Sequence, residues 1–143
     1  MKYYKISPSV ALQPYIMCYY VWEQKQPLVS PLEINSPPNG LGGMVFNYGD
    51  PPYLLKNDGT SERIPSCFVA GQFTRNYTLR LSGTIGMIGV VFWPVGLSYV
   101  LQMPMIEFTD QRVDLQLILK EEAASLENCL LECQTTYTRI QVL

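Results

Sequence analysis

The chain has 143 residues, a formal net charge of −2 from ten basic and twelve acidic side chains, and 48% hydrophobic residues. This length predicts one domain with a hydrophobic core, and the scattered lysines and arginines do not form the basic face typical of a nucleic-acid-binding domain. No apolar run approaches the ~20 residues of a membrane-spanning helix, and the N-terminus lacks the pattern of a signal peptide, so we expect a cytoplasmic protein.

Short apolar segments separated by turn residues fill the first two thirds of the chain. After an irregular stretch over 1–14, which we expect to be a short helix or an arm, β-branched and aromatic residues predict strands. These expected strands cover 15–23, 32–34, 41–49, 53–55, 64–70, 77–81 and 85–93. Pro37-Pro38-Asn39-Gly40 and Asn57-Asp58-Gly59 are strong turn signals between them. Alternation along 15–23 places Ile16 on the same face as Tyr20, and both faces of that strand are apolar or aromatic.

The pattern changes at Pro94, because proline cannot donate to a sheet ladder. A short helix is predicted over 96–102 and a connecting segment over 104–108, after which Thr109-Asp110 could cap a helical region that begins near Val113. The best helical periodicity lies in 121–134, and 135–143 continues it up to the last residue. We interpret that abrupt end as a break inside a helix.

The order of these elements predicts a mainly β fold, a jelly-roll-like barrel or sandwich followed by C-terminal helices. We expect residues 1–103 to form the β domain with its N-terminal arm. Residues 104–143 are expected to form a helical segment.

Catalytic chemistry has little support in the sequence. The chain contains no histidine, which excludes the usual Ser-His-Asp and Cys-His nucleophiles and the common histidine metal sites. The four cysteines, Cys18, Cys67, Cys129 and Cys133, lack the further ligands of a metal centre and are expected to be reduced thiols. No catalytic residue, metal or cofactor is therefore predicted.

Aromatic side chains on the expected strands have two interpretations. They are either ordinary core residues or the wall of an apolar pocket with a few polar groups, the usual form of a small-ligand site. Asn47 and Arg75 are further polar candidates for such a pocket. The ligand-site candidates are Tyr20, Trp22, Phe46, Tyr48, Gln72 and Phe92.

The apolar face of the last helices also has two interpretations, packing on the β domain or pairing with a second copy of the chain. The candidate dimer contacts are Leu126, Leu130, Cys133 and Tyr137.

Several motifs occur together in an order that resembles a known family. They are Pro14-Tyr15-Ile16 with Tyr20 and Glu23, Pro38-x-Gly40 before Met44-Val45-Phe46-Asn47-Tyr48-Gly49, Phe68-Val69-x-Gly71-Gln72-x-Thr74, Ile88-Gly89-Val90-x-Phe92-x-Pro94-x-Gly96, and Glu107-Phe108-Thr109-Asp110 with Val113-x-Leu115. Together they resemble the N-terminal sensor domain of AraC-type transcriptional regulators. Val91 and Val95 depart from the arginine and glycine that this branch often has.

The resemblance implies a cupin-like β-barrel that binds a small-molecule effector, and C-terminal helices that pair two subunits. It also implies a non-catalytic role, with DNA contacted only through a helix-turn-helix domain that is not part of this chain. The alternative function is a small metal-free cupin-like enzyme, an isomerase or sugar-modifying protein, which would need an acid and a base within reach of one substrate. A third possibility is an interaction module that recognises another protein through its helical tail.

Overall fold

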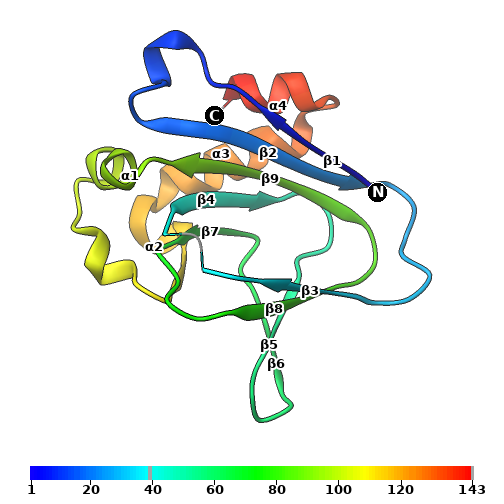
Figure 1. Ribbon diagram of the computed structural model, residues 1–143. Helices are drawn as coiled ribbons and strands as arrows, with labels where there is room; N and C mark the ends of the chain where they lie inside the picture. Colours follow the sequence, from blue (N-terminus) through cyan, green and yellow to red (C-terminus); the bar gives the residue numbers. More distant parts are fainter. Residues whose placement is uncertain (39, 143) are drawn as a thin grey trace.

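The computed structural model describes residues 1–38 and 40–142, with the backbone alone described at 105, 136, 137 and 142. The chain forms three layers, in which helices cover the outer face of a six-stranded sheet and a four-stranded sheet covers its inner face (Figure 1). A mainly β fold with C-terminal helices is therefore confirmed.

The six-stranded sheet is antiparallel throughout and has the order β1-β2-β9-β4-β7-β10. Its strands are β1 (Lys2–Ile6), β2 (Ile16–Gln24), β9 (Ile85–Phe92), β4 (Gly42–Asn47), β7 (Cys67–Ala70) and β10 (Arg112–Asp114). The central strand β9 is buried along almost its whole length, because the helical layer covers one face and the second sheet covers the other. This double burial explains why its sequence is a continuous apolar run rather than an alternating one.

The four-stranded sheet is also antiparallel and has the order β3-β8-β5-β6. Its strands are β3 (Leu32–Ser36), β8 (Tyr77–Leu81), β5 (Tyr53–Leu55) and β6 (Ser61–Arg63). The β5–β6 hairpin extends beyond the rest of the sheet, and its turn at Gly59 has a positive φ of 86° (Figure 1). The predicted turn at 37–40 includes Asn39, which lies outside the described residues, and Gly40 has a φ of 71°.

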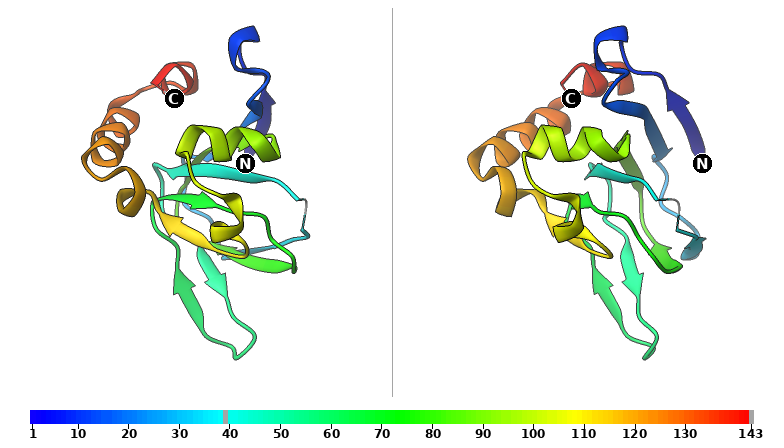
Figure 2. Two further views of the ribbon diagram at one scale, coloured as in Figure 1. Left: turned by 90° about the vertical axis from the view of Figure 1, so that its left-hand side faces the viewer. Right: turned by 60° about the vertical axis from the view of Figure 1, so that its left-hand side comes forward.

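The helices lie around the six-stranded sheet, away from the tip of the β5–β6 hairpin (Figure 2). They are the 3-10 turn η1 (Val10–Leu12), α1 (Pro94–Leu101), η2 (Met105–Phe108), α2 (Leu115–Leu119), α3 (Glu121–Glu132) and α4 (Thr136–Val142). Pro94 stands in the first turn of α1, where a missing backbone N–H costs nothing. Asp114, rather than the expected Thr109-Asp110 pair, caps α2 by accepting a hydrogen bond from the Gln116 backbone N–H at 2.9 Å.

Two apolar clusters fill the spaces between the layers. The larger cluster joins the helices to the six-stranded sheet, and Leu97, Leu115 and Leu130 reach it from α1, α2 and α3. The smaller cluster lies between the two sheets and contains Val45, Ile64, Phe68 and Met87, with Tyr20, Trp22, Leu54, Ala70 and Leu79 packed against it.

The expectation of a closed barrel is wrong. Strands β1 and β10 end one sheet, β3 and β6 end the other, and no ladder joins these edges in the part of the chain that the structure describes. The N-terminal segment contains strand β1, paired with β2, in addition to a helical turn. Strand β10, within the expected helical segment, pairs with β7 and completes the sheet.

One residue of β2 lies on the opposite face from the one predicted. The pairing of β2 with β9 shifts register between Ile16 and Cys18, and such a bulge reverses the alternation of side chains. Ile16 consequently packs in the helix-side cluster with Tyr19 and Val21, whereas Tyr20 faces the space between the sheets.

Candidate functional site

A partly open cavity of about 130 Å³ lies between the two sheets. Most of its wall is aliphatic or aromatic, and its polar groups come from two tyrosines and one arginine. The lining residues are Tyr20, Pro37, Leu41, Gly42, Gly43, Val45, Pro52, Phe68, Ala70, Gly71, Phe73, Tyr77, Leu79, Met87, Val90, Val91 and Arg112. An apolar space with a small number of polar groups is the usual construction of a small-molecule site.

Tyr20 forms one wall of the cavity, and a glycine makes room for its ring. Tyr20 pairs with Gly89 across β2 and β9, and a Cβ atom at position 89 would lie 2.1 Å from the tyrosine ring. The Tyr20 hydroxyl donates to the Met87 sulfur at 3.9 Å. Burial raises the pKa of Tyr20, so this group is a neutral hydrogen-bond donor rather than a base at physiological pH.

Arg112 supplies the positive charge of the cavity. It is the first residue of β10 and pairs with Ala70 of β7. Its guanidinium carbon lies 4.4 Å from the centre of the Phe73 ring and 4.3 Å from the centre of the Tyr77 ring. Both distances are within cation–π range. Burial lowers the pKa of Arg112, although an arginine remains charged at any physiological pH.

The loop that carries Phe73 is fastened to the segment before β10. The Asp110 carboxylate accepts hydrogen bonds from the backbone N–H of Thr74 at 2.6 Å and from its hydroxyl. The Asp110 backbone N–H donates to the Gln72 carbonyl at 2.9 Å. Gly71 allows this approach, because a Cβ atom there would lie 1.9 Å from the Phe108 carbonyl oxygen. This loop positions one of the two rings that contact Arg112.

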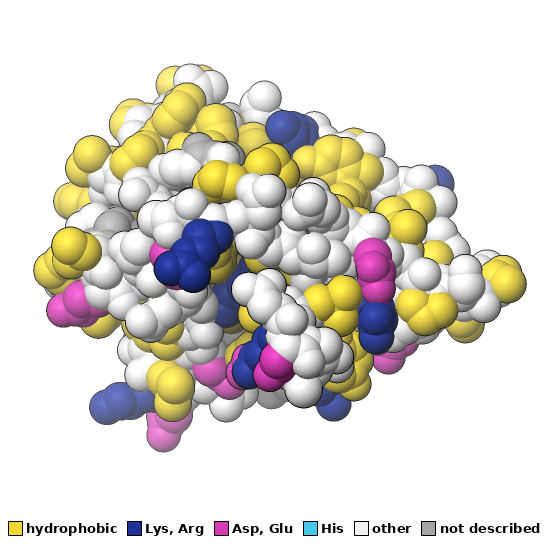
Figure 3. Space-filling model, turned by 60° about the horizontal axis from the view of Figure 1, so that its bottom comes forward, with side chains coloured by type: hydrophobic (Ala, Val, Ile, Leu, Met, Phe, Trp, Pro, Cys, Tyr) yellow, Lys and Arg dark blue, Asp and Glu magenta, His cyan; other side chains and the backbone are white. Residues whose placement is uncertain are grey.

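Two surface hollows meet the cavity at Arg112. One also involves Phe73, Arg75 and Tyr77, and the other involves Glu62 and Ile64. Figure 3 shows a hollow with a basic side chain recessed in it on the face that bears the β5–β6 hairpin. Arg112 therefore stands between the interior cavity and solvent.

The structure does not bring the candidate ligand residues together in one site. Tyr20 lines the cavity. Trp22 packs at the edge of the inter-sheet cluster, with its ring 5.4 Å from that of Tyr3. Phe46 and Phe92 are buried in the helix-side cluster. The remaining two, Tyr48 and Gln72, also do not line the cavity.

Of the further polar candidates, Asn47 donates its side-chain amide to the Ser66 carbonyl at 3.1 Å and so has a structural partner. Arg75 is exposed at the surface hollow. Sequence reasoning did not identify Phe73, Tyr77 or Arg112 as site residues. Tyr77 alternates with Leu79 and Leu81 in the sequence, and this pattern could have identified it as an inward-facing residue.

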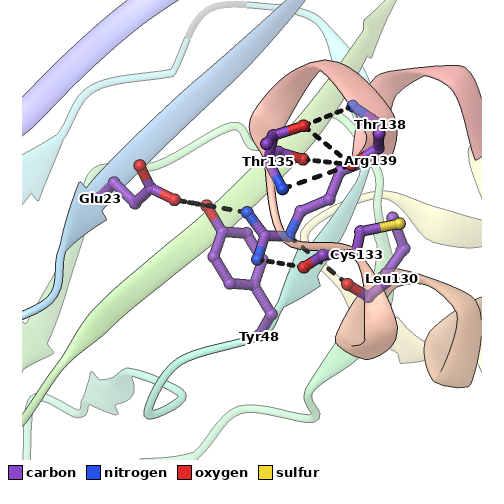
Figure 4. A network of polar contacts seen from close by, with 7 residues as sticks. All are labelled: Glu23, Tyr48, Leu130, Cys133, Thr135, Thr138 and Arg139. Carbon is purple, nitrogen blue, oxygen red and sulfur yellow. Dashed lines mark hydrogen bonds and ion pairs between the residues drawn. The ribbon is translucent and has the colours of Figure 1, made fainter.

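A polar network on the opposite side of the six-stranded sheet holds α4 in place (Figure 4). The Arg139 guanidinium forms an ion pair with Glu23 at 3.4 Å and donates to the carbonyls of Leu130 and Cys133 at the end of α3. It also lies 3.8 Å from the centre of the Tyr48 ring, whose hydroxyl donates to Glu23 at 3.0 Å. Burial and this hydrogen bond raise the pKa of Tyr48.

The candidate dimer contacts lie in this helical layer. Leu130 is only 2% exposed and Leu126 is half-buried, and both pack in the cluster between the helices and the sheet. Cys133 is half-buried, and its thiol donates to the Cys129 carbonyl at 3.0 Å. The Tyr137 side chain lies outside the described residues. The packing interpretation of the helical face thus accounts for Leu126 and Leu130.

Neither a metal-binding cluster nor a membrane-spanning helix occurs among the described residues. No group of three or more cysteine, aspartate or glutamate side chains is arranged to hold a metal ion in that part of the chain. None of the described helices is both long enough and apolar enough to cross a bilayer.

Comparison with known proteins gave one match. A family model described as "Domain of unknown function (DUF6597)" matches residues 4–114. This range includes every residue that lines the cavity and ends at the last residue of β10. No curated protein and no solved structure matches the chain.

Proposed function

Since the chain belongs to the DUF6597 family, and the matched segment encloses the cavity, we propose that this domain binds a small ligand and acts as a sensor rather than as an enzyme. The observation that carries the proposal is the cavity of about 130 Å³ between the sheets. An engineered protein cavity of about 150 Å³ binds benzene, so this space suits a ligand with a body of similar size.

The chemistry of the wall supports binding without catalysis. No carboxylate and no thiol is among the described residues that line the cavity, and the buried Tyr20 phenol is held in its neutral form. General acid–base catalysis needs a group that changes protonation near the working pH. Tyr20, Tyr77 and Arg112 are suited instead to hold and orient a ligand.

The proposal extends to signal transmission within an AraC-type regulator, on the basis of the ordered motifs described above. Tyr20 and Glu23 are three residues apart on β2, one facing the cavity and the other facing α4. A ligand that favours one position of β2 would therefore alter the attachment of α4. A ligand can shift such an equilibrium only by its difference in affinity for the two states. A DNA-binding domain attached after α4 would respond to that shift.

Pairing of two subunits through the helices is also part of the proposal. The contact would use exposed side chains such as Leu131, which is 54% exposed, and not Leu130. Light scattering of the purified chain across a concentration series tests this part separately.

Ligand binding is tested by NMR of the chain with ¹³C-labelled methionine methyl groups. Met87 lines the cavity, whereas Met44 lies in the helix-side cluster and provides an internal control. A mixed library of neutral, cationic and anionic small molecules should contain compounds that shift the Met87 signal in a saturable way and affect Met44 less. The variant Ala70→Leu, which fills part of the cavity, should weaken that binding. If no compound shifts Met87, or if the filled variant binds equally well, the proposal fails.

The link to transcription is tested by the coding sequence that follows Leu143. A continuation into two helix-turn-helix units supports the regulator proposal, and a continuation into an unrelated domain contradicts it.

A further inference from the structure

The arginine of the cavity is partly withdrawn from water, and no acidic side chain forms an ion pair with it among the residues that the structure describes. Arg112 contacts the faces of Phe73 and Tyr77. The ion pairs among the described residues are Lys56–Glu62, Arg80–Glu33 and Arg139–Glu23, and none of them includes Arg112. A charge that is partly desolvated is favourable only when hydrogen bonds or an opposite charge compensate it. Tyr77 provides a hydrogen bond to Arg112, whereas none of these ion pairs supplies the opposite charge.

The acidic side chains near β10 are each engaged elsewhere. Asp110 accepts two hydrogen bonds from Thr74. Asp114 caps α2 through the Gln116 backbone N–H, and Glu62 pairs with Lys56 at 3.2 Å. The carboxylates of Glu62 and Asp110 thus line hollows that also contain Arg112, but each is bonded to another residue, and the guanidinium lies between the cavity and these hollows.

The neighbouring groups define what kind of anion would fit. A guanidinium presents parallel N–H groups that match the two oxygens of a carboxylate. The rings of Phe73 and Tyr77 and the side chains of Val45, Phe68 and Leu79 surround the rest of the space with apolar surface. A fully hydrated inorganic anion would lose its water against such a wall without gaining comparable contacts.

We propose that the cavity binds a small organic carboxylate, with an aromatic or branched apolar body between the sheets and the carboxylate on Arg112. This inference rests on the proposed ligand-binding function and names the class of ligand. Benzoate and its neutral analogue benzamide are suitable probes, because they share a ring of benzene size and differ in charge.

The experiment measures the affinity of both probes for three proteins by titration of the Met87 methyl signal. The proteins are the unaltered chain, Arg112→Gln, and Arg75→Gln as a matched control. Arg75 is an exposed arginine at the adjacent hollow that does not line the cavity, so both variants lose one positive charge. We expect benzoate to bind the unaltered chain roughly 10- to 100-fold more tightly than benzamide, the size of effect that a charged hydrogen-bonded pair gives.

The selectivity for benzoate should disappear in Arg112→Gln and remain in Arg75→Gln, while benzamide binding to Arg112→Gln shows that the cavity is still formed. If Arg112→Gln does not fold, Arg112→Lys replaces it and should weaken benzoate binding, because lysine keeps the charge but not the paired N–H geometry.

Three results would overturn the inference. Equal affinities of benzoate and benzamide for the unaltered chain would exclude carboxylate recognition and leave the sensor proposal standing. An equal loss of benzoate affinity in both variants would show that general surface charge is responsible. If neither probe shifts Met87 at about 10 mM, well above the millimolar range expected of a weak fragment, the carboxylate inference fails. The sensor proposal then depends on whether any other library compound shifts Met87.

Discussion

The substitution Gly89→Ala should damage the cavity wall through a single contact. The added Cβ atom would lie 2.1 Å from the Tyr20 ring, whereas ordinary van der Waals contact begins at 3.4 Å. The ring must therefore move by about 1.3 Å, the difference between these two distances. The direction open to it is the cavity of about 130 Å³ on its other side. Overpacking of this kind costs about 1–3 kcal/mol.

A double-mutant cycle measures whether Tyr20 is the cause of that cost. The free energy of unfolding is measured in urea for the unaltered chain, Gly89→Ala, Tyr20→Ala and the double variant. Removing the ring should relieve the clash, so Gly89→Ala should cost at least about 1 kcal/mol less in the Tyr20→Ala background. Equal costs in both backgrounds would refute the steric explanation. The Met87 methyl signal of Gly89→Ala should also shift without ligand, because the Tyr20 hydroxyl donates to the sulfur of that residue.

Three other predictions concern the helical layer, a buried thiol and the loop beside the cavity. Arg139→Gln should cost about 1–3 kcal/mol in urea unfolding and speed hydrogen exchange in α4, because the side chains of Arg139 and Glu23 are only 11% and 19% exposed. The same change at the exposed Lys56 should cost under about 0.5 kcal/mol, and equal costs would contradict a special role for Arg139. Burial raises the pKa of Cys67 to about 12, so at pH 8 a thiol reagent should label exposed Cys129 in the native protein and Cys67 only after unfolding. Peptide mapping that finds both labelled at one rate would contradict this. Hydrogen bonds from Thr74 lower the pKa of Asp110 below its ordinary 3.8. The hydrogen bonds between Asp110 and Thr74 are therefore fully formed above pH 3.8. They are lost as the pH falls through the lower pKa that Asp110 has in the folded protein. The Thr74 amide resonance should report this change, and Asp110→Ala should abolish it.

Most strands could be predicted because each face of the strand meets either the core or solvent along its length, and this leaves a pattern of apolar residues in the sequence. The alternation of β8 and the apolar run of β9 each follow from what covers them. The edge strand β1 was missed because four of its five residues are exposed, among them Lys2 and Lys5, and carry no buried periodicity. The short hairpin strand β6 was missed for the same reason, because all of its residues are exposed.

The site was harder to predict than the fold. The sequence shows that β2 has two apolar faces, but only the positions of the helical layer and the second sheet decide which face meets the cavity. Phe46 and Phe92 are as aromatic as Tyr20, yet they face the helices. Arg112 belongs to a three-residue strand whose place depends on pairing with β7 and on the Asp110–Thr74 contact. Such long-range pairings leave no periodic signal in the local sequence.

The N-terminal strand has a consequence for how the protein is handled. Strand β1 occupies the outer edge of nine-residue β2, and its exposed lysines discourage another chain from adding a strand there. A shortened version that begins after Ile6 would present the bare hydrogen-bonding groups of β2, together with its tyrosine, valine and tryptophan side chains, as a template for self-association. Fusion partners and affinity tags are accordingly better joined in a way that keeps those first residues in register.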